Sequence, residues 1–168
     1  FFGTYTGKDS KGIYRSELDA ATGKLSAPEL AAEVGSPSFV HIAPDGKTLY
    51  AVGEAAGKDG GGVYSWKLDP ATGKLSDQVS LTSGGAGPCH ISTDPKNQVA
   101  IVANYGGGSC ASFKLKPDGS LDKRVSFVMH AGKVFDAKRQ QGPHGHCGMF
   151  DATGTRAFVC DLGLDQVV

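Results

Sequence analysis

The stretch GIYRSELDAATGKLS, residues Gly12–Ser26, returns fifty residues later as GVYSWKLDPATGKLS, residues Gly62–Ser76. Ten of the fifteen positions are identical between the two copies. A second block, Pro37–Gly53, is repeated as Pro88–Asn104 and more loosely as Gly145–Asp161. The chain therefore holds about three copies of a unit of about fifty residues, a period typical of propellers and other β-repeat arrays.

Each unit predicts four short strands joined by tight turns. In both copies the segment LD-x-ATGK-L-S places an Asp at the head of a turn and a Gly where a positive φ is needed, which is typical of a hairpin connection. In the second unit the apolar and alternating runs predict strands over Ser38–Ala43, Thr48–Gly53, Val63–Leu68 and Leu75–Leu81.

These elements predict an all-β fold, because no segment shows a helical period. Four strands per unit at a fixed period favour a β-propeller over a sandwich, in which equivalent turns need not repeat. Propellers close with roughly four to eight blades, so we expect an incomplete ring, the N-terminal part of a longer protein. Within this single domain, 1–168, we expect a partial blade at 1–35, blades at 36–83 and 84–130, and a partial blade with an inserted loop at 131–168.

The charge balance argues against nucleic acid or a membrane as a partner. Lys plus Arg and Asp plus Glu are equal at 17 each, so no net field attracts a polyanion. No run approaches the ~18 apolar residues of a membrane-spanning helix. We expect a cytoplasmic protein, although the chain starts at Phe1 rather than at an initiator Met, so this expectation does not rest on a missing leader.

The cysteines do not form a recognisable metal or disulfide pattern. They are even in number but show neither CxxC spacing nor a paired His motif of the zinc type. We expect free, mostly buried thiols, with one disulfide as the alternative. Two of the four, Cys110 and Cys160, fall inside strand-like runs, and the others are Cys89 and Cys147.

The repeat also predicts where a functional site would lie. In a propeller the first strand of each blade lines the central channel, so the residues leading into these strands converge on one mouth. They are Pro37–Phe39, Pro88–His90 and His144–Cys147. The last unit, which carries His144 and His146, has an insertion of about six residues that includes Lys138–Pro143. Extra loop length with an Arg and two His at one mouth is the strongest site candidate.

Two histidines and an arginine are the candidate catalytic residues. Imidazole titrates near neutral pH, so His144 or His146 could act as a general base toward water. Arg139 could then hold an anionic group or a developing oxyanion. The alternative is that one His satisfies backbone groups and Arg139 is a solvated loop charge. That alternative is favoured for a single His, whereas the pair together with Arg139 favours function.

Further polar residues at the same mouth are candidates for substrate binding. The second strands of the units end at Asn104 and Asp161, where turn chemistry explains the residues equally well. An His-x-His pair near a third His could bind zinc, but no carboxylate lies in the same loop and the spacing is unspecific, so we expect no metal. The full set of expected substrate-binding residues is His90, Asn104, Tyr105, Gln140 and Asp161.

Seven motif segments run along nearly the whole chain in a fixed order. They are FGTYTG (Phe2–Gly7), the LDAATGKLS and LDPATGKLS turns, GGAGPCHIS (Gly84–Ser92), VANYGGGS (Val102–Ser109), RQQGPHGH (Arg139–His146) and DLGLD (Asp161–Asp165). In these motifs the chain resembles the first half of the lactonase family of seven-bladed β-propellers, a group of 6-phosphogluconolactonase-like proteins that includes carboxy-muconate cyclases.

The resemblance implies a ring of seven blades, of which about three are present, that hydrolyses a sugar-acid lactone without a cofactor. It implies a site on the channel face formed by Arg139, His144 and His146, with Asp161 as a weaker addition. The chain departs from the family pattern at Cys147, where Ser is common, and at Gly53, where Asn is expected.

Three functions remain open at this stage. The leading hypothesis is a lactonase in which a His-activated water attacks the ester carbonyl of a phosphorylated aldonolactone while Arg139 neutralises its phosphate or carboxylate. A carboxy-muconate cyclase would use the same residues on another substrate. A non-catalytic propeller would bind a protein or a sugar, because a fold alone does not fix an activity. If a half-ring were the whole product, its open strand edges would favour self-association.

Overall fold

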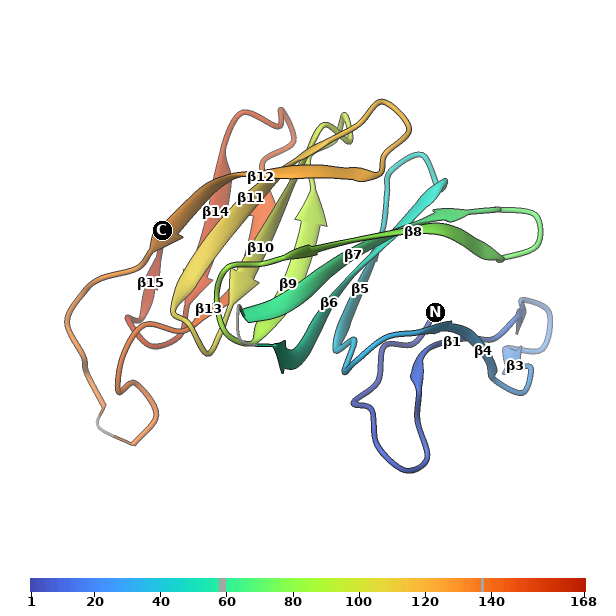
Figure 1. Ribbon diagram of the computed structural model, residues 1–168, viewed down its shortest axis with the longest axis horizontal. Helices are drawn as coiled ribbons and strands as arrows, with labels where there is room; N and C mark the ends of the chain where they lie inside the picture. Colours follow the sequence, from blue (N-terminus) through green and yellow to red (C-terminus); the bar gives the residue numbers. More distant parts are fainter. Residues whose placement is uncertain (58–59, 137) are drawn as a thin grey trace.

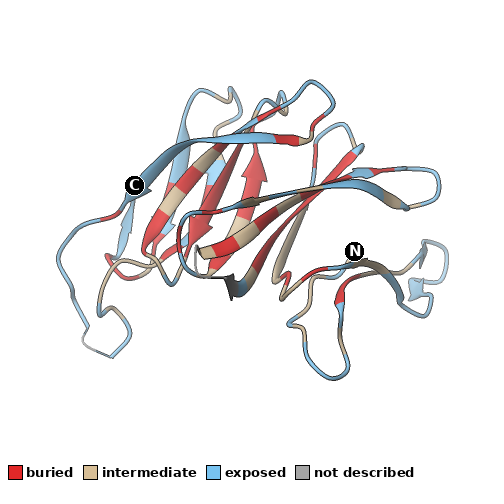
Figure 2. Cartoon of the chain, viewed as in Figure 1, coloured by how far each residue is buried: buried red, intermediate tan, exposed pale blue. Residues whose placement is uncertain are grey.

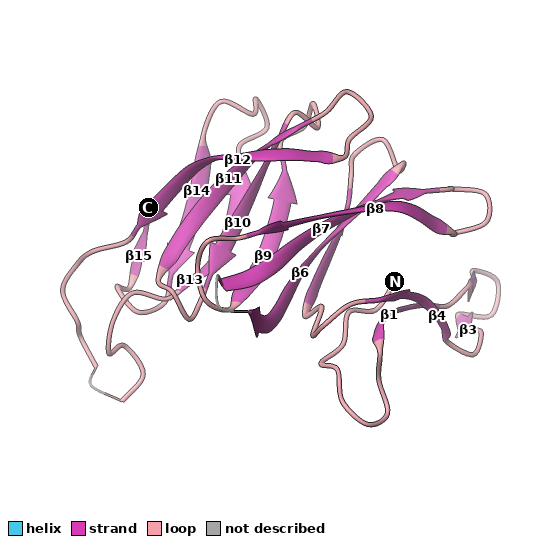
Figure 3. Cartoon of the chain, viewed as in Figure 1, coloured by secondary structure: helices cyan, strands magenta, loops and turns pink. Residues whose placement is uncertain are grey.

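The computed structural model describes residues 1–57, 60–136 and 138–168, and these residues form strands joined by turns and loops (Figures 1 and 3). The described part contains no helix, which confirms the all-β prediction. In particular, no helix there is long and apolar enough to cross a membrane.

The second unit forms a four-stranded antiparallel sheet in the order β5-β6-β7-β8. Its four strands confirm the predicted meander, but the central hairpin is longer than expected. Pairing continues past Gly53 to Gly57, which lies opposite Gly60, so the glycine-rich segment extends the sheet. The strands are β5 (Phe39–Ile42), β6 (Thr48–Gly57), β7 (Gly60–Leu68) and β8 (Leu75–Thr82).

The third unit repeats this sheet, and the flanking units are partial. A second four-stranded sheet has the order β9-β10-β11-β12, and the last three strands form a sheet of their own. The first unit contributes two strand pairs and a bridge between Phe2 and Tyr14. These strands are β9 (Pro88–Thr93), β10 (Val99–Asn104), β11 (Ser109–Leu115), β12 (Leu121–Met129), β13 (Gly145–Phe150), β14 (Ala157–Asp161), β15 (Gln166–Val167), β1 (Gly12–Arg15), β2 (Leu18–Asp19), β3 (Lys24–Leu25) and β4 (Glu29–Glu33).

The repeated ATGK segments are tight turns, as predicted. Asp19 accepts hydrogen bonds from the amide of Ala21 and the hydroxyl of Thr22, at 2.9 and 2.7 Å. Asp69 makes the same pair of bonds fifty residues later. The glycine of each turn is left-handed, with φ of 69° at Gly23 and 64° at Gly73. An Asp that caps the turn and a Gly that adopts positive φ explain why the segment is repeated so closely.

The core lies between the sheets, because each of the two four-stranded sheets packs one face against the unit before it and the other face against the unit after it (Figure 2). Tyr50 and Val52 of β6 pack with Ile91 and Phe113 of the next unit. On the opposite face Trp66 packs with residues of the first unit. The result is a partial β-propeller of about three blades, stacked side by side.

The thiols confirm one part of the cysteine prediction and correct another. All four are free, so the single-disulfide alternative is wrong. They are not mostly buried: three are half-buried and Cys160 is exposed. The reason is that Val159 packs toward Ile101, so Cys160 on the same strand points to the opposite face of the sheet.

Candidate functional site

Three equivalent hydrogen bonds define one mouth of the partial propeller. In each unit an amide within or just after the second strand donates to a carbonyl that precedes the first strand. The bonds are Glu54 N to Ser36 O at 3.0 Å, Tyr105 N to Gly87 O at 2.8 Å and Leu162 N to His144 O at 2.9 Å. The innermost strands β5, β9 and β13 therefore begin at the mouth, and the antiparallel strands β6, β10 and β14 run toward it.

His144 is fixed at this mouth by Tyr105 of the neighbouring unit. The two rings stack with centroids 4.4 Å apart at an angle of 12°. The His144 Nδ1 atom lies 2.9 Å from the Tyr105 carbonyl oxygen. Because a carbonyl can only accept, Nδ1 carries the proton and Nε2 of the neutral ring keeps a lone pair. This is the tautomer that a general base requires.

His146 completes a cluster of three rings. Its imidazole meets the Tyr105 ring edge-on, with centroids 5.6 Å apart at 86°. The side chain is exposed, whereas the neighbouring Gly145 is buried. Together with Cys147, Cys160 and residues of the β14–β15 hairpin, His146 lines a groove of about 440 Å³. The structure thus brings His144, His146 and Tyr105 together beside an open groove.

Asp161 lies beneath this cluster and is 2% exposed. Its Oδ1 accepts the amides of His144 at 2.8 Å and Leu164 at 2.9 Å, and its Oδ2 lies 2.6 Å from His130 Nδ1. Burial opposes ionisation, but the hydrogen bonds from His144, His130 and Leu164 outweigh it and lower the pKa of Asp161. The carboxylate is ionised and engaged internally.

His90 and Asn104 also face inward. His90 lies 4.3 Å from the Phe39 ring, and its Nδ1 accepts the amide of Gly148 at 3.3 Å. Burial, with smaller contributions from His41 and His146, lowers the pKa of His90 to about 4, so the ring is neutral. Asn104 is fully buried and donates to the Ser109 hydroxyl at 3.0 Å.

The inserted loop brings Gln140 to this mouth. The Gln140 side chain donates to the Leu162 carbonyl at 2.9 Å, which ties the loop to the β14–β15 hairpin. Arg139 is exposed, and among the described residues its guanidinium has no ion pair or hydrogen bond. Arg139 is therefore available to an external anion.

The structure adds residues that the sequence analysis did not single out. His130 forms the buried partner of Asp161, and its signal was its place at the end of a fourth strand. Glu54 occupies the position of Tyr105 in the preceding unit and accepts a hydrogen bond of 3.1 Å from the exposed Tyr5 hydroxyl. That bond, followed by the charge of Glu54, raises the pKa of Tyr5.

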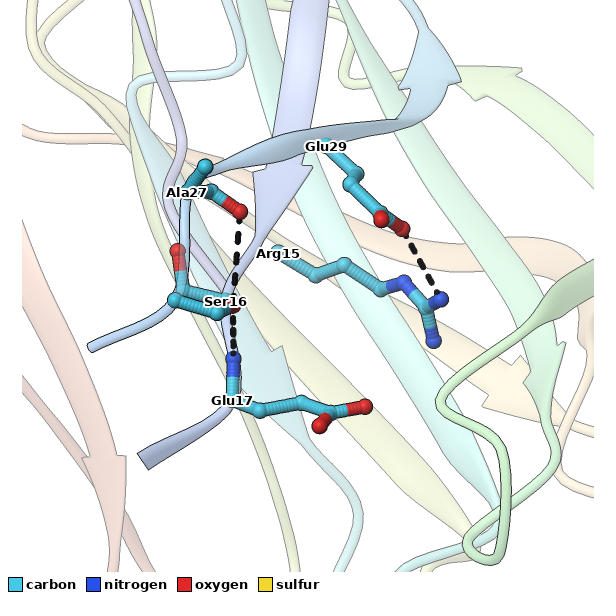
Figure 4. A pocket seen from close by; sticks show the side chains of 6 residues that line it. Arg15, Ser16, Glu17, Ala27 and Glu29 are labelled. Carbon is cyan, nitrogen blue, oxygen red and sulfur yellow. Dashed lines mark hydrogen bonds and ion pairs between the residues drawn. The ribbon is translucent and has the colours of Figure 1, made fainter. Parts of the chain in front are cut away.

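Two other kinds of site, a metal site and a cavity in the first unit, would be alternatives to this mouth. Within the described ranges, no group of three or more His, Cys, Asp or Glu side chains is placed to hold a metal ion. A cavity of about 240 Å³ lies beside Arg15 in the first unit (Figure 4). Its Arg15 is bound to Glu29 at 3.1 Å and to the Thr72 carbonyl, so it links the ATGK turn of the next unit to the first.

Comparison with known proteins places the chain in one family. The family described as "Lactonase, 7-bladed beta-propeller" matches residues 1–168. A 6-phosphogluconolactonase of Bacillus subtilis is 37% identical over 167 residues, which cover 99% of this chain and 47% of that protein. A 6-phosphogluconolactonase of Formosa agariphila is 27% identical over 168 residues, with 99% and 48% covered.

Solved structures agree with this assignment. A Bacteroides fragilis protein superimposes with a TM-score of 0.89 at 36% identity, covering 99% of this chain and 46% of that chain. The periplasmic gluconolactonase PpgL of Pseudomonas aeruginosa gives 0.88 at 32% identity, with 99% and 47% covered. The chain thus spans about half the length of the relatives it matches. Its motifs, its sheets and these likenesses agree, and the chain belongs to the lactonase family of seven-bladed β-propeller proteins.

Proposed function

We propose that the protein hydrolyses a sugar-acid lactone, with a phosphorylated aldonolactone as the leading substrate. The observation that carries this proposal is the fixed tautomer of His144, whose Nδ1–H donates to Tyr105 O and leaves Nε2 as a base. Relatives named 6-phosphogluconolactonase and gluconolactonase support the substrate class.

The chemistry requires one base and one anion site. His144 Nε2 takes a proton from water while the water oxygen attacks the lactone carbonyl. The tetrahedral intermediate then collapses, the ring C–O bond breaks, and the alkoxide oxygen takes the proton back from the imidazolium. The product is an open-chain aldonate. Arg139 holds the phosphate or carboxylate, and His146 serves as the alternative base or as a donor to the oxyanion.

The remaining predicted residues have three proposed roles, which follow from their contacts. Tyr105, half-buried beside both histidines, contacts the substrate directly. Gln140 holds the inserted loop in place, so its effect on the substrate passes through Arg139. His90, Asn104 and Asp161 support the mouth from inside, because each makes at least one hydrogen bond within the chain.

The proposal includes an anionic lactone as the partner, no cofactor, no nucleic acid and no membrane. It also takes the protein as cytoplasmic. Since one structural relative is named as periplasmic, cell fractionation with an antibody to the full-length protein tests that part separately. Recovery in the periplasmic fraction would contradict the compartment and leave the chemistry unaffected.

The test of function is a lactonase assay on the full-length protein and two variants. His144→Ala is expected to lower kcat by about 100- to 10,000-fold, the usual contribution of a general base. Arg139→Ala is expected to raise KM for a phosphorylated lactone more than for an uncharged one. Lys138→Ala, a neighbouring exposed cation in the same loop, serves as the matched control and should leave both constants unchanged.

The outcomes separate the three functions. Hydrolysis of δ-lactones that depends on His144 supports the proposal. Turnover of muconolactones alone would favour the cyclase. Equal, near-zero turnover in the unsubstituted protein and every variant would indicate a binding module.

A further inference from the structure

A completely buried His–Asp pair lies directly beneath the turn that carries His144. The side chains of His130 and Asp161 are 0% exposed, and Nδ1 of His130 lies 2.6 Å from Oδ2 of Asp161. We propose that His130 is a positioning residue: acting through Asp161, it fixes the backbone of His144 and so the direction of the His144 imidazole. The activity test of this proposal rests on the proposed function, but the proposal itself concerns only geometry.

The hydrogen bonds form a continuous chain from His130 to the mouth. Asp161 Oδ2 accepts a hydrogen bond from His130 Nδ1, and Asp161 Oδ1 accepts hydrogen bonds from the amides of His144 at 2.8 Å and Leu164 at 2.9 Å. With both oxygens held, the carboxylate cannot rotate. His144 is then fixed at its backbone by Asp161 and at its ring by the Tyr105 carbonyl. Without His130, Oδ2 loses its partner and Oδ1 can turn away from His144.

The other repeats show that the fold does not need this pair. The residue after the fourth strand donates its amide in the same way in each unit: Val34 to Lys11, Ser83 to Gly61 and His130 to Gly108. The position of Asp161 is likewise occupied by Gly53 and Asn104, each at or within the second strand. The equivalent pairs are therefore Val34 with Gly53, Ser83 with Asn104, and His130 with Asp161.

Of the three pairs, only His130 with Asp161 holds the segment that leads into the first strand, because Asp161 accepts the amide of His144. In the preceding unit the Asn104 Oδ1 atom is buried and, among the described residues, has no hydrogen-bond partner, so it does not hold Gly87 as Asp161 holds His144. The His130 Nε2 atom is also buried without a described partner. A buried polar atom left unpaired is unfavourable. His130 has this unpaired buried atom, and it pairs with the one unit that carries the His-Gly-His turn. This combination fits a functional rather than a structural requirement.

The experiment compares three substitutions in the full-length protein. His130→Asn keeps an amide donor near the place of Nδ1, and His130→Leu removes it. The double variant His130→Ser with Asp161→Asn copies the residues of the preceding unit and is expected to fold. Ser83→Ala, at the equivalent position of that unit, is the matched control. The measurements are kcat, KM, the melting temperature and hydrogen exchange at the His144 amide.

The leucine variant and the double variant are expected to lose up to about 100-fold in kcat, the scale of a misplaced catalytic group, with little change in KM. Both should lose exchange protection at His144, and the asparagine variant should retain most of kcat and protection. Ser83→Ala should resemble the unsubstituted protein in kcat and in His144 protection, although its melting temperature should fall because the buried Ser83 hydroxyl donates to the Gly85 carbonyl. If His130→Leu does not fold, the double variant and His130→Asn test the positioning role of His130 instead.

Two results would overturn the proposal. One is a folded double variant whose kcat and whose hydrogen-exchange protection at the His144 amide equal those of the unsubstituted protein. The other is equal damage by asparagine and leucine, because the donated proton would then be irrelevant. If the unsubstituted protein hydrolyses no lactone, the proposed function fails, and hydrogen exchange alone decides: unchanged His144 protection in His130→Leu refutes the positioning role.

Discussion

The neutral imidazole of His90 links stability to pH at the start of β13. It accepts the Gly148 amide through Nδ1, lies against Phe39, and has its Nε2 atom 3.5 Å from Cys147 Sγ. Protonation of Nδ1 would remove the acceptor and place a charge in a half-buried position. Burial is therefore the main reason that the pKa of His90 falls from 6.5 to about 4.

Folding should weaken with acid in a defined window. Between pH 6.5 and about 4, His90 is protonated in the unfolded chain but stays neutral in the folded chain. The free energy of unfolding therefore falls as the pH falls. His41, whose pKa is lowered by burial, acts in the same direction. Denaturant titrations from pH 7.5 to 4.5 should show a smaller loss in His90→Gln than in the unsubstituted protein. Identical pH dependence in both would contradict this assignment.

At the residue scale the sequence indicated which side chains gather at the mouth but not how they are held. The His-Gly-His turn and Tyr105 could be placed together because the repeat aligns strand ends. The hydrogen bond from His144 Nδ1 to the Tyr105 carbonyl joins residues 39 positions apart. Whether it forms depends on the side-chain torsion angles of His144, which the sequence does not give. The pairing of His130 with Asp161 likewise depends on packing between units, which a repeat alignment does not encode.

Strand β6 is tied to the neighbouring sheet by a side-chain hydroxyl. Tyr50 is fully buried, and its hydroxyl donates to the Gly119 carbonyl in the turn between β11 and β12, at 2.5 Å. Gly119 has a φ of 84°, so the turn presents its carbonyl in a conformation that favours glycine. Burial raises the pKa of Tyr50 to about 12, so the hydroxyl remains a donor over the physiological range.

Removal of that hydroxyl should destabilise the junction between two blades. Tyr50→Phe keeps the ring but leaves the Gly119 carbonyl without this donor, and we expect a loss of about 1–3 kcal/mol in the free energy of unfolding. Tyr64→Phe is the control, because among the described residues the Tyr64 hydroxyl has no hydrogen bond. Urea unfolding of both variants provides the measurement. An equal, negligible effect at both positions would show that water replaces the bond.

At the element scale the strands could be predicted because turn chemistry marks their ends. The Asp and Gly of the ATGK turns delimit β7 and β8 closely. The extension of β6 to Gly57 was not predicted, because Gly57 and Gly60 read as a break in an alternating pattern yet pair across the hairpin. The inserted loop had no periodicity from which its hydrogen bond to Leu162 could be inferred.

Across the whole molecule, cohesion comes from cores shared by adjacent sheets. Phe113 of β11 is fully buried, in one cluster with Val63 of the preceding sheet. Neither sheet could bury that face alone, as expected for a repeat array. This shared burial is what the fifty-residue period predicted, because a repeat of that size implies stacked neighbours.

A cavity at this shared core should loosen two blades together. Phe113→Ala is expected to cost about 3–5 kcal/mol and to raise hydrogen exchange in both β7 and β10. Phe135→Ala, at a side chain that is 60% exposed, should change neither. Hydrogen exchange read by mass spectrometry on both variants makes the comparison. Increased exchange confined to one sheet would contradict the idea of a common core.

The ATGK turns carry a genetic consequence. Two segments that share ten of fifteen residues lie fifty residues apart, and each forms the same Asp-capped loop with a left-handed glycine. A deletion or duplication that joined one turn to the other would remove or add fifty residues and rejoin the backbone at matching conformations. A gain or loss of one blade at these turns is therefore a change in chain length that leaves the junction unstrained.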